Sequence, residues 1–152
     1  MPVIRNAAET DIPQIIKLYN EQLSLGPTET ESTLDPSSED FRRVLKQMEA
    51  LPGCEIFVAE EEGTVTGTAM VMIVPNLSHN GLPWAIVENV VVDRSHRRNG
   101  TGKMLMEHIA NRAREAGCYK VQLMSDKSRH QAHLFYQAIG YRPSAEGFRL
   151  YL

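Results

Sequence analysis

The chain has 152 residues and a formal net charge of −3. This is the length of one domain that can bury a core, so we expect residues 1–152 to form a single domain. The acidic balance argues against general nucleic-acid affinity, and no apolar run of about 18 residues is present to span a membrane. We also expect no secretory signal, and the two cysteines, Cys54 and Cys118, fit reduced thiols in a cytoplasmic protein.

Hydrophobic periodicity predicts a mixed α/β (α+β) fold. Runs rich in valine and isoleucine favour strands, and apolar residues with a period near 3.6 favour helices. Ser, Thr and Asp precede the first two helices as caps. The expected elements are a strand over 3–7, a helix capped by Thr10 or Asp11, a loop over 25–36, a helix capped by Ser37 or Ser38, a hairpin of strands over 54–60 and 64–74, a strand over 85–92, a helix over 104–116, a strand over 119–124, a helix over 132–139 and an edge strand over 148–152.

The loop over residues 93–103 carries the strongest signal for a ligand. It joins a valine-rich strand to a helix and reads Asp-Arg-Ser-His-Arg-Arg-Asn-Gly-Thr-Gly-Lys. Gly100 and Gly102 allow a tight turn and a close approach of the backbone to a ligand. A helix N-terminus adds a positive dipole end, and the arginines and the lysine of the loop add positive charge. The segment therefore predicts a phosphate-binding loop.

Two common nucleotide-binding loops do not fit this segment. A dinucleotide fingerprint needs glycine where the chain has Leu105, and a Walker A loop needs glycine at Arg97 and Ser or Thr at Met104. The pattern that fits is Arg-x-x-Gly-x-Gly, formed by Arg97, Gly100 and Gly102. With the valine strand before it, this pattern resembles the acetyl-CoA pyrophosphate loop of the GCN5-related N-acetyltransferase (GNAT) family.

A second motif of the same family follows downstream. The sequence Ala-x-x-Phe-Tyr-x-x-x-Gly-Tyr begins at Ala132 and ends at Tyr141. Its apolar members share one helical face, and Gly140 ends the helix. It resembles the second acetyltransferase signature, in which the hydroxyl of the tyrosine, here Tyr136, reaches the CoA sulfur. The alternative is that Tyr136 is an ordinary core aromatic residue.

The resemblance implies a single-domain GNAT acyl-CoA N-acyltransferase fold, with a mixed, mostly antiparallel sheet flanked by helices. It implies acetyl-CoA as co-substrate, no metal, direct transfer in a ternary complex, and a small-molecule amine as acceptor. Related enzymes are commonly dimers. Many members have Asn where this chain has Arg129, so that contact is in doubt, and Ser125 could substitute in part. The implied cofactor-binding residues are Val90, Val91, Val92, Arg97, Arg98, Asn99, Gly100, Thr101, Gly102, Lys103, Ser125, Arg129 and Tyr136.

Glu88 is the candidate general base, and Tyr136 is the candidate acid for the leaving thiolate. A charged residue inside the most apolar strand is costly to bury unless it is partnered or functional. Similar enzymes often carry a carboxylate at this place, which acts directly or through water. The alternative is a glutamate at a solvated strand end or in an ion pair. Strand alternation places Asn89 on the face opposite to Glu88.

Other features leave the acceptor open. The segment over 25–40 carries Glu29, Glu31, Asp35, Glu39 and Asp40, and we expect this acidic border to favour a cationic amine. His130 and His133 share a helix face but lack further ligands to complete a metal set. Two other readings remain: a catalytically silent CoA-binding regulatory module, and a small hydrolase of a phosphate ligand.

Overall fold

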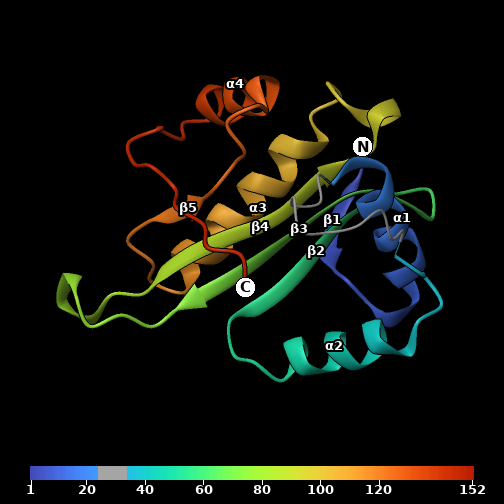
Figure 1. Ribbon diagram of the computed structural model, residues 1–152, viewed down its shortest axis with the longest axis horizontal. Coiled ribbons are helices and arrows are strands. Elements are labelled where there is room, and N and C mark those ends of the chain that lie inside the picture. Colours follow the sequence, from blue (N-terminus) through green and yellow to red (C-terminus); the bar gives the residue numbers. More distant parts are fainter. Residues whose placement is uncertain (24–33) are drawn as a thin grey trace. The chain divides into compact units, whose positions relative to one another are not determined.

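The computed structural model describes residues 1–23 and 34–152 of the chain (Figure 1). The contacts group the chain into two units, residues 1–122 and residues 123–152. Within the described residues, no helix is long and apolar enough to cross a membrane.

A five-stranded sheet forms the centre of the first unit, with the strands in the order β1-β2-β3-β4-β5. Its first four strands pair antiparallel, for example through Ile4 opposite Ala59 and Val71 opposite Val87. The predicted hairpin is present, and so is the valine-rich strand after it. The strands are β1 (Val3–Asn6), β2 (Cys54–Glu61), β3 (Thr64–Val74), β4 (Trp84–Val92) and β5 (Val121–Leu123), the last of which ends at the boundary between the units.

Helices cover both faces of this sheet (Figure 1). Helix α1 (Ile12–Gln22) packs on the face that carries Val58, and helix α2 (Glu39–Glu49) packs against α1. Helix α3 (Thr101–Glu115) lies on the other face, where the His108 ring is 4.5 Å from the ring of Phe57. Because Phe57 and Val58 are neighbours in a strand, their side chains point to opposite faces of the sheet. Helix α3 covers Phe57, and helix α1 covers Val58.

The caps of the first two helices differ. Ser38 caps α2 as predicted, since its Oγ accepts a hydrogen bond from the Asp40 N–H at 3.3 Å. Asp11 precedes α1 but makes no side-chain cap. Its buried carboxylate accepts instead from Arg5 Nη1 at 2.7 Å, from Arg5 Nη2 at 2.9 Å and from the Ala8 N–H at 2.7 Å. Asp11 therefore ties the start of α1 to strand β1.

The two cysteines are shielded thiols. Cys54 is buried at the start of β2 and Cys118 is half-buried after α3. Burial raises the pKa of both thiols above the usual value. A raised pKa disfavours the reactive thiolate form of both residues.

The second unit contains helix α4 (His130–Ala138), followed by an irregular C-terminal segment. The turn before α4 is fixed by Asp126, whose Oδ1 accepts from the N–H and Oγ of Ser128 at 2.9 Å and 2.6 Å. The predicted edge strand over 148–152 is wrong, because the structure assigns no strand there. Phe148 and Leu150 alternate with polar residues, yet both are exposed, so no neighbouring strand covers them.

Candidate functional site

The loop between β4 and α3 is held by its own side chains. Asp93 follows β4, and its Oδ1 accepts from the Ser95 N–H at 2.8 Å and from Ser95 Oγ at 2.9 Å. The hydrogen bonds from Ser95 lower the pKa of Asp93. A short 3-10 helix, η3 (Arg94–His96), follows and leads into the glycine-containing turn. These hydrogen bonds hold the start of the loop in a defined turn.

Helix α3 begins at Thr101, not at the predicted Met104, and Gly100 is its N-cap. Gly100 has a φ of 84°, which favours glycine, and no side chain caps the helix there. The N–H groups of the first turn have no acceptors within the helix. Arg98 also has a positive φ of 65°, so the backbone turns twice just before the helix. Such a turn at a helix N-terminus is suited to bind an anion.

Close packing fixes this helix end against the sheet. Thr101 is buried, and Gly67 of β3 lies beside it. A Cβ atom at Gly67 would lie 3.1 Å from Leu105 Cδ1, 3.2 Å from the Val91 carbonyl oxygen and 3.3 Å from Thr101 Cγ2. The absence of a side chain at Gly67 therefore lets the first turn of α3 approach β3 and β4.

The cations of the loop are exposed, and some have partners that the sequence did not indicate. Arg97 Nε donates to the Val92 carbonyl at 3.2 Å, and Arg97 Nη2 donates to Gln22 Oε1 at 2.8 Å. Arg94 Nε donates to the same Gln22 oxygen at 3.3 Å. Lys103 pairs with Glu107 at 3.7 Å. Gln22 was missed because it lies in α1, far from the loop in sequence. The remaining predicted residues of the loop, Arg98 and Asn99, are exposed and Gly102 is half-buried.

Strand β4 contains a β-bulge in its middle. Glu88 pairs with Met70 and Val91 pairs with Thr68, so both Asn89 and Val90 lie opposite one residue of β3. Asn89 has a φ of 54°, which Asn tolerates better than most residues. The bulge interrupts strand alternation at this point. The face of Asn89 therefore does not follow from alternation, which was the basis of our prediction.

Tyr19 of α1 reaches this bulge. Burial raises the pKa of Tyr19 to about 12, and a hydrogen bond with the side chain of Asn89 opposes part of that rise. A polar group buried in this way is stabilised by such a partner. Tyr19 thus links α1 to the one strained residue of β4.

Glu88 lies next to the bulge, and its side chain is exposed. Glu88 therefore lies within the apolar strand, as expected, but it is not buried there, so the anticipated cost of burial does not arise. The neighbouring Val87 and Val91 are buried instead. Exposure leaves Glu88 accessible to a substrate, and its role as the base stays a prediction.

Strand β5 is too short to pair with the whole edge of β4. Strand β4 has nine residues and β5 has three. Two hydrogen bonds hold the segment before β5 to the start of β4, from Tyr119 N–H to the Pro83 carbonyl and from Ala85 N–H to the Lys120 carbonyl, both at 3.0 Å. The predicted contact residues Val90–Val92 lie at the opposite end of β4.

The other predicted residues lie in the second unit. Tyr136 is buried in α4, with its ring 5.2 Å from Phe135 and 6.0 Å from Tyr141. Arg129 is the half-buried N-cap residue of α4 and makes no side-chain cap. The Oγ of Ser125 is buried, and it has no hydrogen-bond partner among the described residues. A buried hydroxyl without a partner is costly, which marks Ser125 as a group suited to an external partner.

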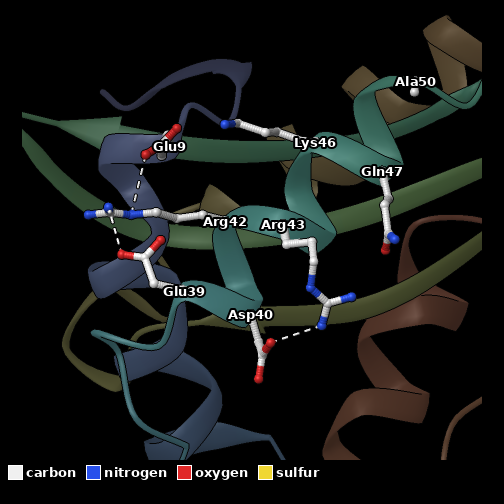
Figure 2. A pocket seen from close by; sticks show the side chains of 8 residues that line it. All are labelled: Glu9, Glu39, Asp40, Arg42, Arg43, Lys46, Gln47 and Ala50. Carbon is white, nitrogen blue, oxygen red and sulfur yellow. Dashed lines mark hydrogen bonds and ion pairs between the residues drawn. The ribbon is translucent and has the colours of Figure 1, made fainter.

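A shallow hollow on the outer face of α2 is a separate feature (Figure 2). Five of its charged side chains are paired with one another: Arg42 with Glu9 at 3.3 Å and Glu39 at 3.1 Å, and Arg43 with Asp40 at 2.9 Å. None of the predicted site residues lines it. These pairs also neutralise part of the expected acidic border over 25–40. Glu29 and Glu31 lie outside the described residues.

The motifs and the fold agree with one family, and a comparison with known proteins decides it. A model described as "Acetyltransferase (GNAT) family" matches residues 13–141. The chain belongs to the GNAT family. The predictions of the family and of the fold are thereby confirmed. Among the residues that the structure describes, no group of three or more His, Cys, Asp or Glu side chains is placed to hold a metal ion.

Similar proteins show the range of this GNAT chain's relatives. It is 35% identical to a glucosamine 6-phosphate N-acetyltransferase of Trypanosoma brucei brucei over 96 residues, which is 63% of each chain and thus less than two thirds of that relative. It is 28% identical to the L-amino acid N-acyltransferase MnaT of Escherichia coli, over 94% of this chain and 81% of that one. A solved structure from Bacillus halodurans, described as a transcriptional regulator, has a TM-score of 0.90 and 28% identity over 100% of both chains.

Proposed function

We propose that the chain is an acetyl-CoA-dependent N-acetyltransferase that acetylates the primary amine of a small molecule by direct transfer in a ternary complex. The observation that carries this proposal is the uncapped N-terminus of α3, which follows the loop with its three exposed arginines, Arg94, Arg97 and Arg98. Backbone N–H groups, a helix dipole and positive charges meet there, which suits the pyrophosphate of CoA. Family membership supports the same co-substrate.

Further residues support the proposal of acetyl-CoA as co-substrate. The backbone of Val90–Val92, beyond the bulge, lies at the end of β4 away from the bonded start of β5, and we propose that it pairs with the pantetheine arm. The buried Oγ of Ser125 has no partner among the described residues, and an amide of that arm would supply one. When bound, acetyl-CoA supplies an activated acetyl group as a thioester.

The residues of the chain then have distinct tasks in the proposal. A backbone N–H near the bulge donates to the thioester oxygen, where negative charge develops. Glu88, which is exposed, takes a proton from the bound ammonium group, directly or through water, so that the amine becomes a nucleophile. As the C–S bond breaks, the hydroxyl of Tyr136 gives a proton to the leaving sulfur, and the second proton that nitrogen loses on forming the amide balances this donation.

The relatives support the acceptor class. Glucosamine 6-phosphate and an L-amino acid are each a small molecule that carries both a primary amine and an anionic group. The acidic border over 25–40 is weaker support for a cationic amine than the sequence suggested, because Glu39 and Asp40 are paired with arginines. We therefore propose amino sugar phosphates and amino acids as the first acceptors to try. We also propose that the enzyme is cytoplasmic and forms a homodimer, as the resemblance implies.

Two measurements test the proposal. Acetyl-CoA should raise the melting temperature, because it binds only the folded chain. Gly102→Val should abolish that rise, because a bulky side chain blocks the approach of the backbone to the pyrophosphate. A screen of primary amines with acetyl-CoA, followed by release of free thiol, should identify an acceptor. An unchanged rise in a folded Gly102→Val variant would contradict the assignment of the loop.

A second candidate function is a CoA-binding regulatory module without catalysis. The observation in its favour is the similarity over the full length to the Bacillus halodurans protein described as a transcriptional regulator. This candidate predicts that acetyl-CoA raises the melting temperature as above. It also predicts no thiol release with any amine, which separates it from the enzyme.

A further inference from the structure

Gln22 is the last residue of α1 and contacts the loop that follows β4. Its Oε1 accepts two hydrogen bonds, from Arg97 Nη2 at 2.8 Å and from Arg94 Nε at 3.3 Å. The C-terminal end of a helix also carries partial negative charge, which favours nearby cations. One amide oxygen thus holds two arginines of the loop together.

The bonds to Arg97 leave its charge available. Its guanidinium has five N–H donors, and its hydrogen bonds within the described residues, to Val92 and to Gln22, use two of them. Both acceptors are neutral oxygens, so they fix the orientation of the side chain without cancelling its charge. Lys103 differs, because it pairs with the carboxylate of Glu107. Arg97 is therefore both held in place and able to bind an anion.

The same face of α1 contacts the bulge in β4. Tyr19, three residues before Gln22 and hence on the same side of the helix, is hydrogen-bonded to the side chain of Asn89. Gln14, more than two turns earlier on α1, contacts the β2–β3 hairpin instead: its Oε1 accepts from the Val65 N–H at 2.8 Å. The C-terminal half of α1 thus serves the loop and the bulge.

We infer that Gln22 is a positioning residue for the phosphate end of CoA, which it serves by holding Arg97 and Arg94 in a preorganised pair. This inference rests on the proposed function, because the loop must bind the CoA phosphates. Holding a side chain in its binding orientation reduces the entropy lost when the ligand binds. Gln22 itself needs no contact with CoA.

The test compares Gln22→Ala with Gln14→Ala, a glutamine of the same helix that is distant from the loop. Calorimetry gives the Kd of each variant for CoA and for pantetheine, which lacks the phosphates. Gln22→Ala should weaken CoA binding by about 2- to 12-fold, the range for one net hydrogen bond, and should leave pantetheine binding unchanged. Gln14→Ala should lower the melting temperature and leave both Kd values unchanged.

Gln22→Glu is a second test, which changes the charge beside the two arginines. It keeps an acceptor for both arginines but adds a negative charge that competes with phosphate. CoA should therefore bind more weakly than to the unmodified chain, and added salt should reduce the difference by screening.

Three outcomes would overturn the inference. One is an unchanged Kd for CoA in folded Gln22→Ala, and another is equal weakening of CoA and pantetheine, which would mean a general structural role. The third is no CoA binding by the unmodified chain, which overturns the proposed function as well. The first two leave the proposed function intact, so the two failures are distinguishable.

Discussion

Asp11→Asn tests how strongly the start of α1 is held. The carboxylate of Asp11 is buried and accepts two bonds from Arg5 and one from the Ala8 N–H, at 2.7 to 2.9 Å. Asparagine has the same shape but only one acceptor oxygen. Its NH₂ group then faces an N–H donor that the carboxylate had satisfied. Arg5 keeps its bond to Glu60, so only the Asp11 side of the network is lost.

The expected loss follows from these bonds. Hydrogen bonds to a charged group contribute about 1.5–3 kcal/mol each, and at least one is lost, so we expect a loss of about 2–4 kcal/mol in the free energy of unfolding. For a chain of this length, 1 kcal/mol shifts the melting temperature by about 2–4 °C, so the variant should melt about 4–16 °C lower. Thermal unfolding at neutral pH, followed by circular dichroism, measures the difference.

The pH dependence gives the decisive result. Arg5 first, and then the Ala8 N–H, lower the pKa of Asp11 in the folded chain, against an unfolded value near 4. The stabilisation is therefore complete above the unfolded pKa and is lost as the pH falls through the folded pKa. The gap in melting temperature between the two proteins should narrow with acid. A constant gap from pH 7 to pH 3 would refute this reasoning. Asp35→Asn is the control: among the described residues, its exposed side chain is bonded only to Ser37, so the variant should melt close to the unmodified chain.

Three further variants test the site. Tyr136→Phe deletes only the hydroxyl, so kcat should fall by about 10- to 10⁴-fold if proton delivery to sulfur limits the rate, with little change in folding or acetyl-CoA affinity. Glu88→Gln should slow turnover near neutral pH and make the loss of rate in acid shallower, because the amide cannot gain a proton in that range. Gly67→Ala should destabilise the chain by about 1–3 kcal/mol, since its Cβ would lie 3.1–3.3 Å from Leu105, Val91 and Thr101. The same change should weaken CoA binding, because it displaces the first turn of α3.

Each of these has a result that counts against it. Full turnover in Tyr136→Phe would make Tyr136 an ordinary core aromatic residue. If Glu88→Gln keeps the shape of the pH–rate profile and loses only cofactor affinity, the base is another residue. An unchanged melting temperature and CoA affinity in Gly67→Ala would show that α3 adapts to the added methyl group.

The sequence predicted the elements whose signals are local. Three valines define the end of β4, Ser38 caps α2 by its own side chain, and the glycines of residues 100–102 mark the turn before α3. These features depend on neighbours along the chain. For this reason, the family, the fold and the position of the loop could be predicted from the sequence.

The errors concern contacts between distant segments. The bulge at Asn89 appears only in the pairing of β4 with β3, so strand alternation gave the wrong basis for the faces of Glu88 and Asn89. Gln22 meets Arg97 across 75 positions, and no local pattern marks such a pair. The alternation of Phe148 and Leu150 had no strand to pair with, so it did not produce a strand. Hydrophobic periodicity is a property of one segment, whereas these features depend on the distant segment that it contacts.

The shielded thiol of Cys54 offers a native reporter of local opening. Cys54 begins β2, pairs with Met72 of β3 and donates its N–H to the Leu51 carbonyl at 3.1 Å. Because it is buried and its pKa is raised, a thiol reagent must wait for this corner of the sheet to open. The labelling rate relative to a free thiol then gives the free energy of that opening. Cys118, which is half-buried, reacts with the same reagent at its own rate. It therefore serves as an internal comparison when labelling is followed by mass spectrometry.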